Sequence, residues 1–466
     1  MADSILTAEQ RVLKDPGKAL KEAVEALQQK DFSKAADIYR EILLFDPYQP
    51  GFWSNLSIAL RNLGHRDTAV ACARRAVALN PDDLLYLVNL SDCLAALDLM
   101  DEALDALEKA LKIEPENLIY RRKYAAALQQ SGGHGEALAQ TSIIRTKEPD
   151  DAETTWQQGR INLALGNFLA GWKDYEMRWK RGFLKEKDYG AAPQWSGQYL
   201  ADKTILLHEE QGFGDTIFAA RYIPLVKQRG ARVLFQCRSV MHTLFKDLPG
   251  IDRLPLEGPL GERFDYHAPL LSLPGVFNTT LETIPPPAHL SCADTLPPEV
   301  AQMLAAGKDR FKVGIVWSGN PEFKDNYKRA VPFSRFLPLM EIPGIQFYSL
   351  QKGAAEKELE VAGAQGLVLE LTPHLKAFAE TAAAVKKLDL IIMTDSAVAH
   401  LAGSLGKPVW NLLHFSPFWA YLLDRSDSPW YPSMRLFRQQ HPGDWDGVFK
   451  EVAAELEKAV LKHKSG

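Results

Sequence analysis

Four segments in the first third of the chain align without gaps: KAADIYREILLFDP (34–47), TAVACARRAVALNP (68–81), EALDALEKALKIEP (102–115) and EALAQTSIIRTKEP (136–149). Each segment ends in a proline, and successive prolines are 34 residues apart. A small residue stands twelve positions before each proline, at Ala35, Ala69, Ala103 and Ala137. An alanine lets two helices approach closely, and a proline ends the second helix of the pair. The pattern therefore predicts a solenoid of helix pairs.

This period is typical of the tetratricopeptide repeat, and the repeats are predicted to span 16–49, 50–83, 84–117 and 118–151. A fifth unit, 152–183, departs from the pattern, with Gly171 where the alanine recurs. Terminal repeats are usually atypical because one face meets a different neighbour. We therefore expect a repeat domain over 1–183 whose last unit docks on the part that follows. Such arrays bind peptides or proteins, so we predict that the repeat groove binds a protein partner; the alternative is a spacer or assembly element.

Composition and charge exclude several classes of protein. The chain has 466 residues, 46% of them hydrophobic and 24% charged, and its formal net charge is −5. That balance argues against a protein that binds nucleic acid mainly through charge. The sequence shows neither a basic and apolar leader nor an apolar run long enough to span a bilayer. We expect a cytoplasmic protein without a transmembrane segment and with reduced cysteines.

The remaining two thirds is predicted to be α/β. After a linker over 184–203, apolar runs at 204–210 and 232–237 alternate with helical patterns and predict a first lobe over 204–300. A proline-rich stretch marks the break between the lobes. The alternation resumes in a second lobe over 301–466, with strands expected at 311–319, 345–351, 388–396 and 407–413 and a helix at the end. The predicted fold class is an α-solenoid followed by two Rossmann-like lobes, with ligands at the carboxyl ends of their strands.

The first candidate site motif is GFGD, which runs from Gly212 to Asp215 between a strand and a helix. Glycines such as Gly212 and Gly214 let a backbone approach a ligand closely. The full G-x-G-x-x-G fingerprint is missing because residue 217 is isoleucine, which argues against a dinucleotide-binding domain. Asp215 is interpreted either as a helix cap or as a general base.

The second motif is TDSAVAHLAGSLGKPVW, residues 394–410. Asp395 and Ser396 open a helix directly after the most apolar strand, and the free N–H groups of such a helix can hold a diphosphate. His400 lies one turn further on the same face. A lone histidine there is usually a packed core residue, but its polar neighbours favour ligand binding.

The third motif is the polar loop WSGNPEFKDNYKRAVP, residues 317–332, which follows a strand. Its hydroxyl, amide and cationic side chains suit phosphate oxygens, and the alternative is a solvated surface loop. Asp444 and Asp446 form an Asp-x-Asp pair of the kind that holds a metal in some enzymes, but their place before the last helix favours a capping role. No metal site is predicted.

From residue 206 to its end the chain resembles the ADP-heptose:lipopolysaccharide heptosyltransferase family, and in particular members that carry tetratricopeptide repeats. The motifs that carry the resemblance are the GD pair before a helix, WSGNP, SLQKG, DSAVAHLAGSLGKPVW and SPWYPSMRLFRQ. The arrangement of repeats and transferase is also similar to that of O-GlcNAc transferases and bacterial flagellin glycosyltransferases.

The resemblance implies a GT-B fold, an inverting mechanism without a metal requirement, and no cofactor besides the nucleotide-diphosphate sugar donor. It implies that Asp215 is the base that deprotonates the acceptor. It places donor contacts at Trp317, Ser318, Asn320, Lys328, Arg329, Gln351, Lys352, Asp395, Ser396, Ala397 and His400. The sequence therefore predicts a glycosyltransferase with a protein acceptor. The alternatives are a heptosyltransferase-like enzyme with a glycan or lipid acceptor, and a non-catalytic interaction protein with a relic transferase module.

Overall fold

A computed structural model describes residues 15–182, 189, 192–210, 212–256, 258, 260–323 and 326–465. The predictions that fall on 1–14, on 183–188 and on two further linker residues lie outside this range. The chain forms two compact units, 1–154 and 155–466. Among the described residues, none of the helices combines the length and apolar character needed to cross a bilayer.

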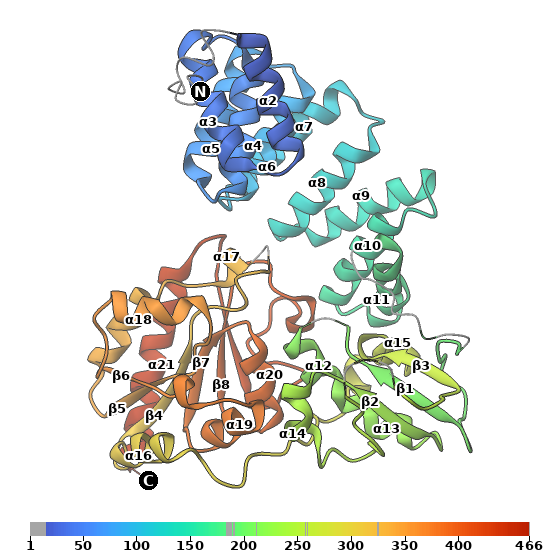
Figure 1. The fold of residues 1–466 in the computed structure, drawn as a ribbon, viewed down its shortest axis with the longest axis vertical. Helices are drawn as coiled ribbons and strands as arrows, with labels where there is room; N and C mark the ends of the chain where they lie inside the picture. The colour runs from blue at the N-terminus through green and yellow to red at the C-terminus, as the bar shows by residue number, and fades with distance from the viewer. Residues whose placement is uncertain are drawn as a thin grey trace, which may run out of the picture. The chain divides into compact units, whose positions relative to one another are not determined.

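The first unit is a stack of helix hairpins (Figure 1). Its helices are α2 (Pro16–Gln28), α3 (Phe32–Phe45), α4 (Pro50–Asn62), α5 (Arg66–Leu79), α6 (Leu84–Ala95), α7 (Met100–Ile113), α8 (Leu118–Gln130) and α9 (His134–Lys147). The second helix of each pair ends two residues before the repeat proline. All four repeat alanines are 0% exposed, which leaves no room for a larger side chain where the helices cross. The predicted solenoid is confirmed.

The fifth helical unit belongs, from residue 155 onward, to the second compact unit. It comprises α10 (Ala152–Ala164), α11 (Phe168–Tyr175) and the 3-10 helix η1 (Glu176–Arg181). A Cβ atom at Gly171 would lie 2.6 Å from Leu163 Cδ2, so these helices pack too closely even for the alanine of the other repeats. Trp172 and Tyr175 are buried in the core of the α/β module, and the Trp172 indole donates to the Thr279 carbonyl at 2.9 Å. The unit therefore docks on the lobes that follow it.

The first lobe contains a three-stranded parallel sheet in the order β2-β1-β3. Its elements are β1 (Thr204–His208), α12 (Phe213–Ala219), η2 (Ala220–Tyr222), α13 (Ile223–Lys227), β2 (Arg232–Gln236), η3 (Ser239–Met241), α14 (His242–Phe245), β3 (Tyr266–Pro269), η4 (Leu270–Ser272), α15 (Leu273–Val276) and η5 (Leu281–Thr283). The strands after 204 and 232 were predicted, whereas β3 was not. At four residues, one of them a proline, β3 is too short to show a periodic pattern.

The second lobe contains a six-stranded parallel sheet in the order β6-β5-β4-β7-β8-β9. Its elements are α16 (Pro298–Ala306), β4 (Phe311–Val316), α17 (Asn326–Arg329), η6 (Phe333–Glu341), β5 (Ile345–Ser349), η7 (Ala354–Glu356), α18 (Lys357–Val361), β6 (Val368–Glu370), η8 (Thr372–His374), α19 (Phe378–Lys386), β7 (Leu390–Thr394), α20 (Ala397–Ser404), β8 (Val409–Leu413), η9 (Trp419–Tyr421), β9 (Met434–Arg438) and α21 (Trp445–Ser465). Counted within the lobe, this is the doubly wound order 3-2-1-4-5-6. The strand order reverses between β4 and β7, which is where ligands bind in such sheets.

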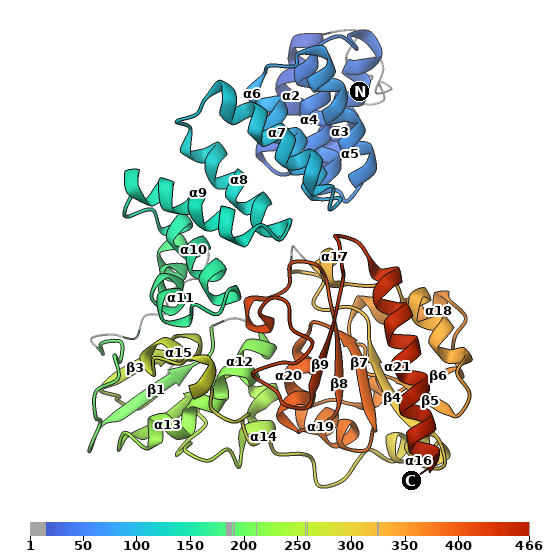
Figure 2. The ribbon, with the colours of Figure 1, turned by 180° about the vertical axis from the view of Figure 1, so that it is seen from behind.

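Side chains of the second sheet alternate between two cores. Ile391 and Met393 face a core shared with α19 and α20, whereas Leu390 and Ile392 face a core shared with α21. Figure 2 shows α21 running across its face of this sheet. Because helices cover both faces, the strand reads as a continuous apolar run, and this is why it could be predicted from the sequence. The predicted solenoid followed by two Rossmann-like lobes is confirmed.

Candidate active site

The turn after β1 places Asp215 in the first turn of α12. Gly212 is the residue before this helix, and its N–H donates to Asp215 Oδ2 at 2.9 Å. Both predicted roles are therefore compatible, because the capping bond occupies one carboxylate oxygen and leaves Oδ1 available. No other hydrogen bond to this carboxylate occurs among the residues that the structure describes.

Two further carboxylates follow β1, and each is paired with an arginine. Glu209 forms an ion pair with Arg238 at 3.0 Å and accepts the Arg238 backbone N–H at 3.1 Å. Glu210 forms an ion pair with Arg178 at 2.7 Å. Asp215 forms no ion pair with a cationic side chain among the described residues. Of the three carboxylates, Asp215 is the one left for chemistry.

The surroundings of Asp215 raise its pKa to about 6. Burial is the main cause, and the negative charges of Glu210 and Asp395 raise the pKa further. The Gly212 N–H and the charge of Arg329 oppose this shift. A carboxylate with a pKa near the working pH is suited to accept a proton, because it is ionised and still basic.

In the second lobe, two polar segments meet at the reversal of strand order. β4 pairs with β7 in parallel, so the loop after residue 316 and the segment after residue 394 leave the sheet side by side. In the β4 loop, Asn326 donates to Ser318 Oγ at 3.1 Å and accepts the Gly319 N–H at 3.1 Å. The side chain of Asn326 thus closes the loop on itself.

Arg329 extends from this loop toward Asp395 of the neighbouring segment. Its Nε donates to Asn326 Oδ1 at 3.3 Å, and its Nη1 lies 3.9 Å from Asp395 Oδ2. The guanidinium also stacks 4.6 Å from the centre of the Phe323 ring. Arg329 therefore lies at the reversal point, and its polar contacts to described residues are long.

Asp395 and His400 are held by two tyrosines. Tyr421 donates to Asp395 Oδ1 at 2.8 Å, and the Tyr431 hydroxyl lies 3.1 Å from His400 Nδ1. Burial lowers the pKa of His400 to about 4, so the ring is neutral at pH 7. Ser396 precedes α20 without capping it, and its Oγ is buried with no hydrogen-bond partner among the described residues.

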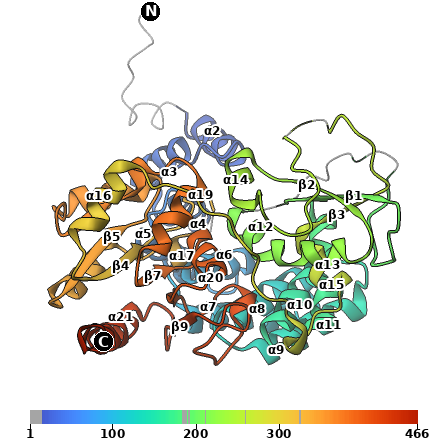
Figure 3. The same ribbon diagram turned by 90° about the horizontal axis from the view of Figure 1, so that it is seen from below.

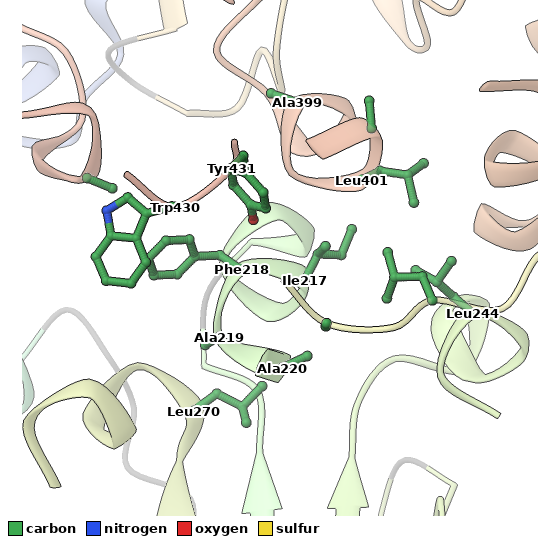
Figure 4. Close-up of a cluster of buried hydrophobic side chains, with 14 of the residues drawn as sticks. Ile217, Phe218, Ala219, Ala220, Leu244, Leu270, Ala399, Leu401, Trp430 and Tyr431 are labelled. Carbon is green, nitrogen blue, oxygen red and sulfur yellow. The ribbon is translucent and has the colours of Figure 1, made fainter. Parts of the chain in front are cut away.

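The two lobes touch where their motifs lie. A Cβ at Gly214 would lie 2.9 Å from His400 Cδ2 and 3.4 Å from Ala397 Cα. Helices α12 and α20 lie side by side in Figure 3. Figure 4 shows the apolar layer between them, in which Phe218 of α12 packs 4.6 Å from Trp430. The structure therefore brings the glycine-rich turn and the helix that begins after Asp395 together.

Other predicted donor contacts are engaged in the protein's own structure. The Trp317 indole is 0% exposed and packs 5.0 Å from Phe333. Gln351 is buried and accepts the N–H groups of both Trp317 and Ser318, at 3.0 and 2.9 Å. Lys352 donates to the Leu375 carbonyl at 2.6 Å. These residues shape the backbone around Ser318, and their contact with a donor stays a prediction.

Two predicted residues lie at the rim of the same loop. Asn320 is exposed, and its Oδ1 accepts the Glu322 N–H at 3.0 Å. Lys328 lies 5.9 Å from the centre of the Tyr327 ring. The donor contacts of both residues also stay predictions.

The Asp-x-Asp pair lies at the start of α21. Asp444 Oδ1 accepts the Gly447 N–H at 2.8 Å, and Asp446 forms an ion pair with Arg335. The capping role favoured for Asp444 agrees with this geometry. Within the described ranges, no group of three or more His, Cys, Asp or Glu side chains is arranged to hold a metal ion.

Sequence reasoning missed Asn326, Tyr421 and Tyr431 as parts of the site. Tyr421 lies at the end of η9, 26 residues after Asp395, so no local spacing connects them. Asn326 could have been suspected from the polar loop after β4, and Tyr431 from the SPWYP motif.

The chain is similar to several known proteins over different parts of its length. Residues 55–117 match the family described as Tetratricopeptide repeat. The chain is 27% identical over 436 residues to Protein FlbA of Caulobacter vibrioides, covering 86% of this chain and 72% of that protein. A crystal structure titled glycosyl transferase family 9, from Veillonella parvula, aligns with 57% of this chain and 100% of its own, at 12% identity and a TM-score of 0.43. MamA from Desulfovibrio magneticus aligns with 38% of this chain and 99% of its own, at 14% identity and a TM-score of 0.33.

The repeat match begins within α4 and includes α5, α6 and α7, and the 34-residue period recurs in all four hairpins. The parallel sheets in the orders β2-β1-β3 and β6-β5-β4-β7-β8-β9 complete the second part of the chain. The chain thus combines four helix hairpins, of which 55–117 match the tetratricopeptide repeat family, with two lobes that are each built on a parallel sheet.

Proposed function

We propose that this protein is an inverting glycosyltransferase with a nucleotide-diphosphate sugar as its donor. The observation that carries the proposal is Asp215, a carboxylate without a cation partner among the described residues, whose pKa is raised to about 6. It stands one residue after Gly214, which contacts the start of α20. A base at this place takes the proton of an acceptor hydroxyl in the transition state.

The donor diphosphate is proposed to bind at the start of α20. The first N–H groups of a helix are free, and its positive end favours phosphate. Ser396 supplies a hydroxyl that has no hydrogen-bond partner among the described residues, and Arg329 supplies a positive charge 3.9 Å from Asp395. We propose that these groups, rather than a metal ion, stabilise the charge that develops on the leaving nucleoside diphosphate.

The reaction is a single displacement at the anomeric carbon. The acceptor oxygen forms a bond to this carbon while the bond from the carbon to the phosphate oxygen breaks. The proton of the acceptor moves to Asp215, and the bonding electron pair leaves with the nucleoside diphosphate. Attack from the side opposite the leaving group inverts the configuration.

The acceptor is proposed to be a protein that binds to the repeats. Tetratricopeptide arrays present an extended surface to peptides and proteins. Within this solenoid, Asp92 on α6 pairs with Arg61 on α4 at 3.6 Å and with Lys123 on α8 at 2.6 Å. Side chains from three successive repeats thus meet on one surface, which provides charges of both signs for a partner.

Replacement of Asp215 by asparagine tests the enzymatic proposal. We expect transfer to fall at least about a hundredfold, because the base is lost, while the affinity for the donor changes by less than about threefold. Titration calorimetry with a panel of nucleotide sugars identifies the donor, and sugar release or transfer gives the rate. Asp446→Asn is the matched control, because this exposed aspartate pairs with Arg335, which has no role in the proposed site.

Two results contradict the proposal. Wild-type turnover in Asp215→Asn would remove the role given to this residue. A wild-type chain that binds no nucleotide sugar would favour the relic module.

The acceptor class needs its own test. Mass spectrometry of cells with the wild-type chain, with Asp215→Asn and without the gene product should reveal a sugar-sized mass that only the wild type adds to a protein. The same mass on a lipid or glycan fraction, with proteins unchanged, would favour the heptosyltransferase-like alternative.

A further inference from the structure

The fifth helical unit is joined to the turn before Asp215 by a buried ion pair. Arg178 lies in η1, and Glu210 follows β1. Both side chains are only 2% exposed. Arg178 Nε donates to Glu210 Oε2 at 2.7 Å, and Nη2 donates to Oε1 at 3.1 Å. Such a two-point contact fixes the orientation of both groups as well as their distance.

Further hydrogen bonds lock the same two side chains. Glu210 Oε1 also accepts the Leu271 N–H at 2.9 Å. Arg178 donates to Ser272 Oγ at 2.7 Å and to Glu176 Oε1 at 2.6 Å. Glu176 in turn accepts the Ser272 hydroxyl at 2.9 Å. Both carboxylate oxygens of Glu210 therefore accept hydrogen bonds from Arg178, and Arg178 is itself fixed by its bonds to Ser272 and Glu176.

Stability alone explains this pair poorly. Desolvation of two charges offsets most of their attraction, and buried ion pairs can often be replaced by apolar side chains without loss of stability. The position of the pair is more informative. Glu210 stands five residues before Asp215, and Gly212 and Gly214 lie between them. A glycine-containing turn has many accessible conformations, so its geometry depends on how its ends are anchored.

We propose that Arg178 is a positioning residue for the active site: by holding both oxygens of Glu210, it fixes the turn that presents Asp215. This inference rests on the function proposed above for Asp215. It makes the last helical unit a structural part of the catalytic module.

The charges around Asp215 give this proposal a specific readout. Glu210 on the same turn and Asp395 at the end of β7 raise the pKa of Asp215, whereas Arg329 on α17 lowers it. The Tyr175 hydroxyl on α11 also interacts electrostatically with Asp215. Loss of the Glu210 charge should lower the pKa of Asp215. Loss of Arg178 leaves Glu210 without its counter-ion and should raise it.

The experiment uses the full chain with Arg178→Met, Arg178→Lys and Glu210→Gln. The double variant Arg178→Met/Glu210→Met leaves no unpaired buried charge, so it keeps the test possible if Arg178→Met does not fold. Arg232→Met is the matched control. It removes an arginine from the pair with Glu262 at the opposite end of the same sheet.

The first measurement is the pH dependence of kcat/KM for transfer. We expect kcat to fall at least about tenfold in Arg178→Met and in the double variant, with the donor KM changed less than about threefold. The acid limb of the pH profile of kcat/KM follows the pKa of Asp215. It should move to higher pH in Arg178→Met and to lower pH in Glu210→Gln. Arg178→Lys keeps the positive charge but loses the two-point contact of the guanidinium, so it should retain intermediate activity.

The second measurement is amide hydrogen exchange of residues 212–219, which does not depend on activity. We expect exchange at least about tenfold faster in Arg178→Met and in the double variant, and unchanged in Arg232→Met. A double variant with wild-type kcat and wild-type exchange would overturn the positioning role. If the wild-type chain transfers no sugar, the proposed function fails, and the exchange rates alone decide whether Arg178 holds the turn.

Discussion

At the scale of single residues, burial shifts the pKa values of two neighbouring side chains in opposite directions. The pKa of Asp215 rises to about 6, and that of His400 falls to about 4. Burial disfavours the charged form of each group. The charged form of the aspartate is the deprotonated base, whereas the charged form of the histidine is the protonated acid. At pH 7 the aspartate is mostly ionised and the histidine is neutral. His400 therefore adds no positive charge that would weaken the basicity of Asp215.

The neutral state of His400 should make the α/β unit sensitive to acid. Its pKa is about 4 in the folded protein and 6.5 in the unfolded chain, so the unfolded chain binds the proton first as the pH falls. Its contribution to stability is complete above pH 6.5 and is lost toward pH 4, by about 2 kcal/mol between pH 7 and pH 5. The raised pKa of Asp215 has the opposite effect, because it stabilises the folded protein as the pH falls. The test therefore compares the wild type with a variant of His400.

Urea unfolding of the wild type and of His400→Gln at pH 7 and pH 5 provides that difference. We expect the variant to lose less stability on acidification than the wild type. Equal losses in both proteins would show that His400 does not titrate with a lowered pKa.

Gly214 should tolerate no side chain. A methyl group there would lie 2.9 Å from His400 Cδ2 and 3.4 Å from the Ala397 backbone, so α12 and α20 would have to separate. We expect Gly214→Ala to destabilise the α/β unit by about 1–3 kcal/mol and to reduce transfer. Thermal unfolding and the transfer assay measure the two effects.

Gly135→Ala is the control for this substitution, because nothing lies within 4 Å of a Cβ at that helical glycine. The control should be as stable as the wild type or slightly more stable. Equal behaviour of the two variants would contradict the close contact between α12 and α20.

At the scale of elements, an aromatic cluster joins three parts of the α/β unit. Trp419 of η9 packs edge-on against Trp172 of α11 at 5.1 Å and against Phe218 of α12 at 5.9 Å. Tyr421, two residues later, donates to Asp395. The cluster therefore connects the last helical unit and the first lobe with Asp395, which stands two residues before α20.

Trp419→Ala should loosen all three elements together. A buried tryptophan reduced to alanine leaves a large cavity, and we expect a loss of about 3–5 kcal/mol in the stability of this unit. Donor affinity should also fall, because Tyr421 loses its support. Circular dichroism in urea and titration calorimetry measure the two changes; a loss below about 1 kcal/mol would contradict the central place of this side chain.

At the scale of the whole molecule, the two compact units have separate cores. The buried clusters of 15–154 share no member with those of 155–466. Units without a common core unfold independently unless their interface is large. We therefore expect two transitions in scanning calorimetry of the full chain.

Core substitutions should assign the two transitions. Ala103→Leu overfills a helix crossing where the alanine is 0% exposed, and it should lower only the transition of the repeats. Ile392→Ala removes a buried side chain from the second sheet and should lower only the other transition. A shift of both transitions by either variant would contradict independent unfolding.

Local patterns made much of this fold predictable. The repeat alanines and prolines recur at a fixed period, because each helix pair packs on its neighbour in the same way. The strand at 390–394 could be predicted because helices cover both of its faces, which makes the run apolar throughout. β3, β6 and β9 were missed because short or mixed segments leave no periodic signal.

The sequence by itself determined the order of the parts and the motifs where strands end, because period and apolar runs are properties of neighbouring residues. Only the tertiary structure decided which of those motif residues face one another. It placed Gly214 against His400, buried the Trp317 indole, and paired Arg178 with Glu210, 32 residues away. Contacts, burial and pKa shifts depend on segments that are distant in the chain, and no spacing within one motif encodes them.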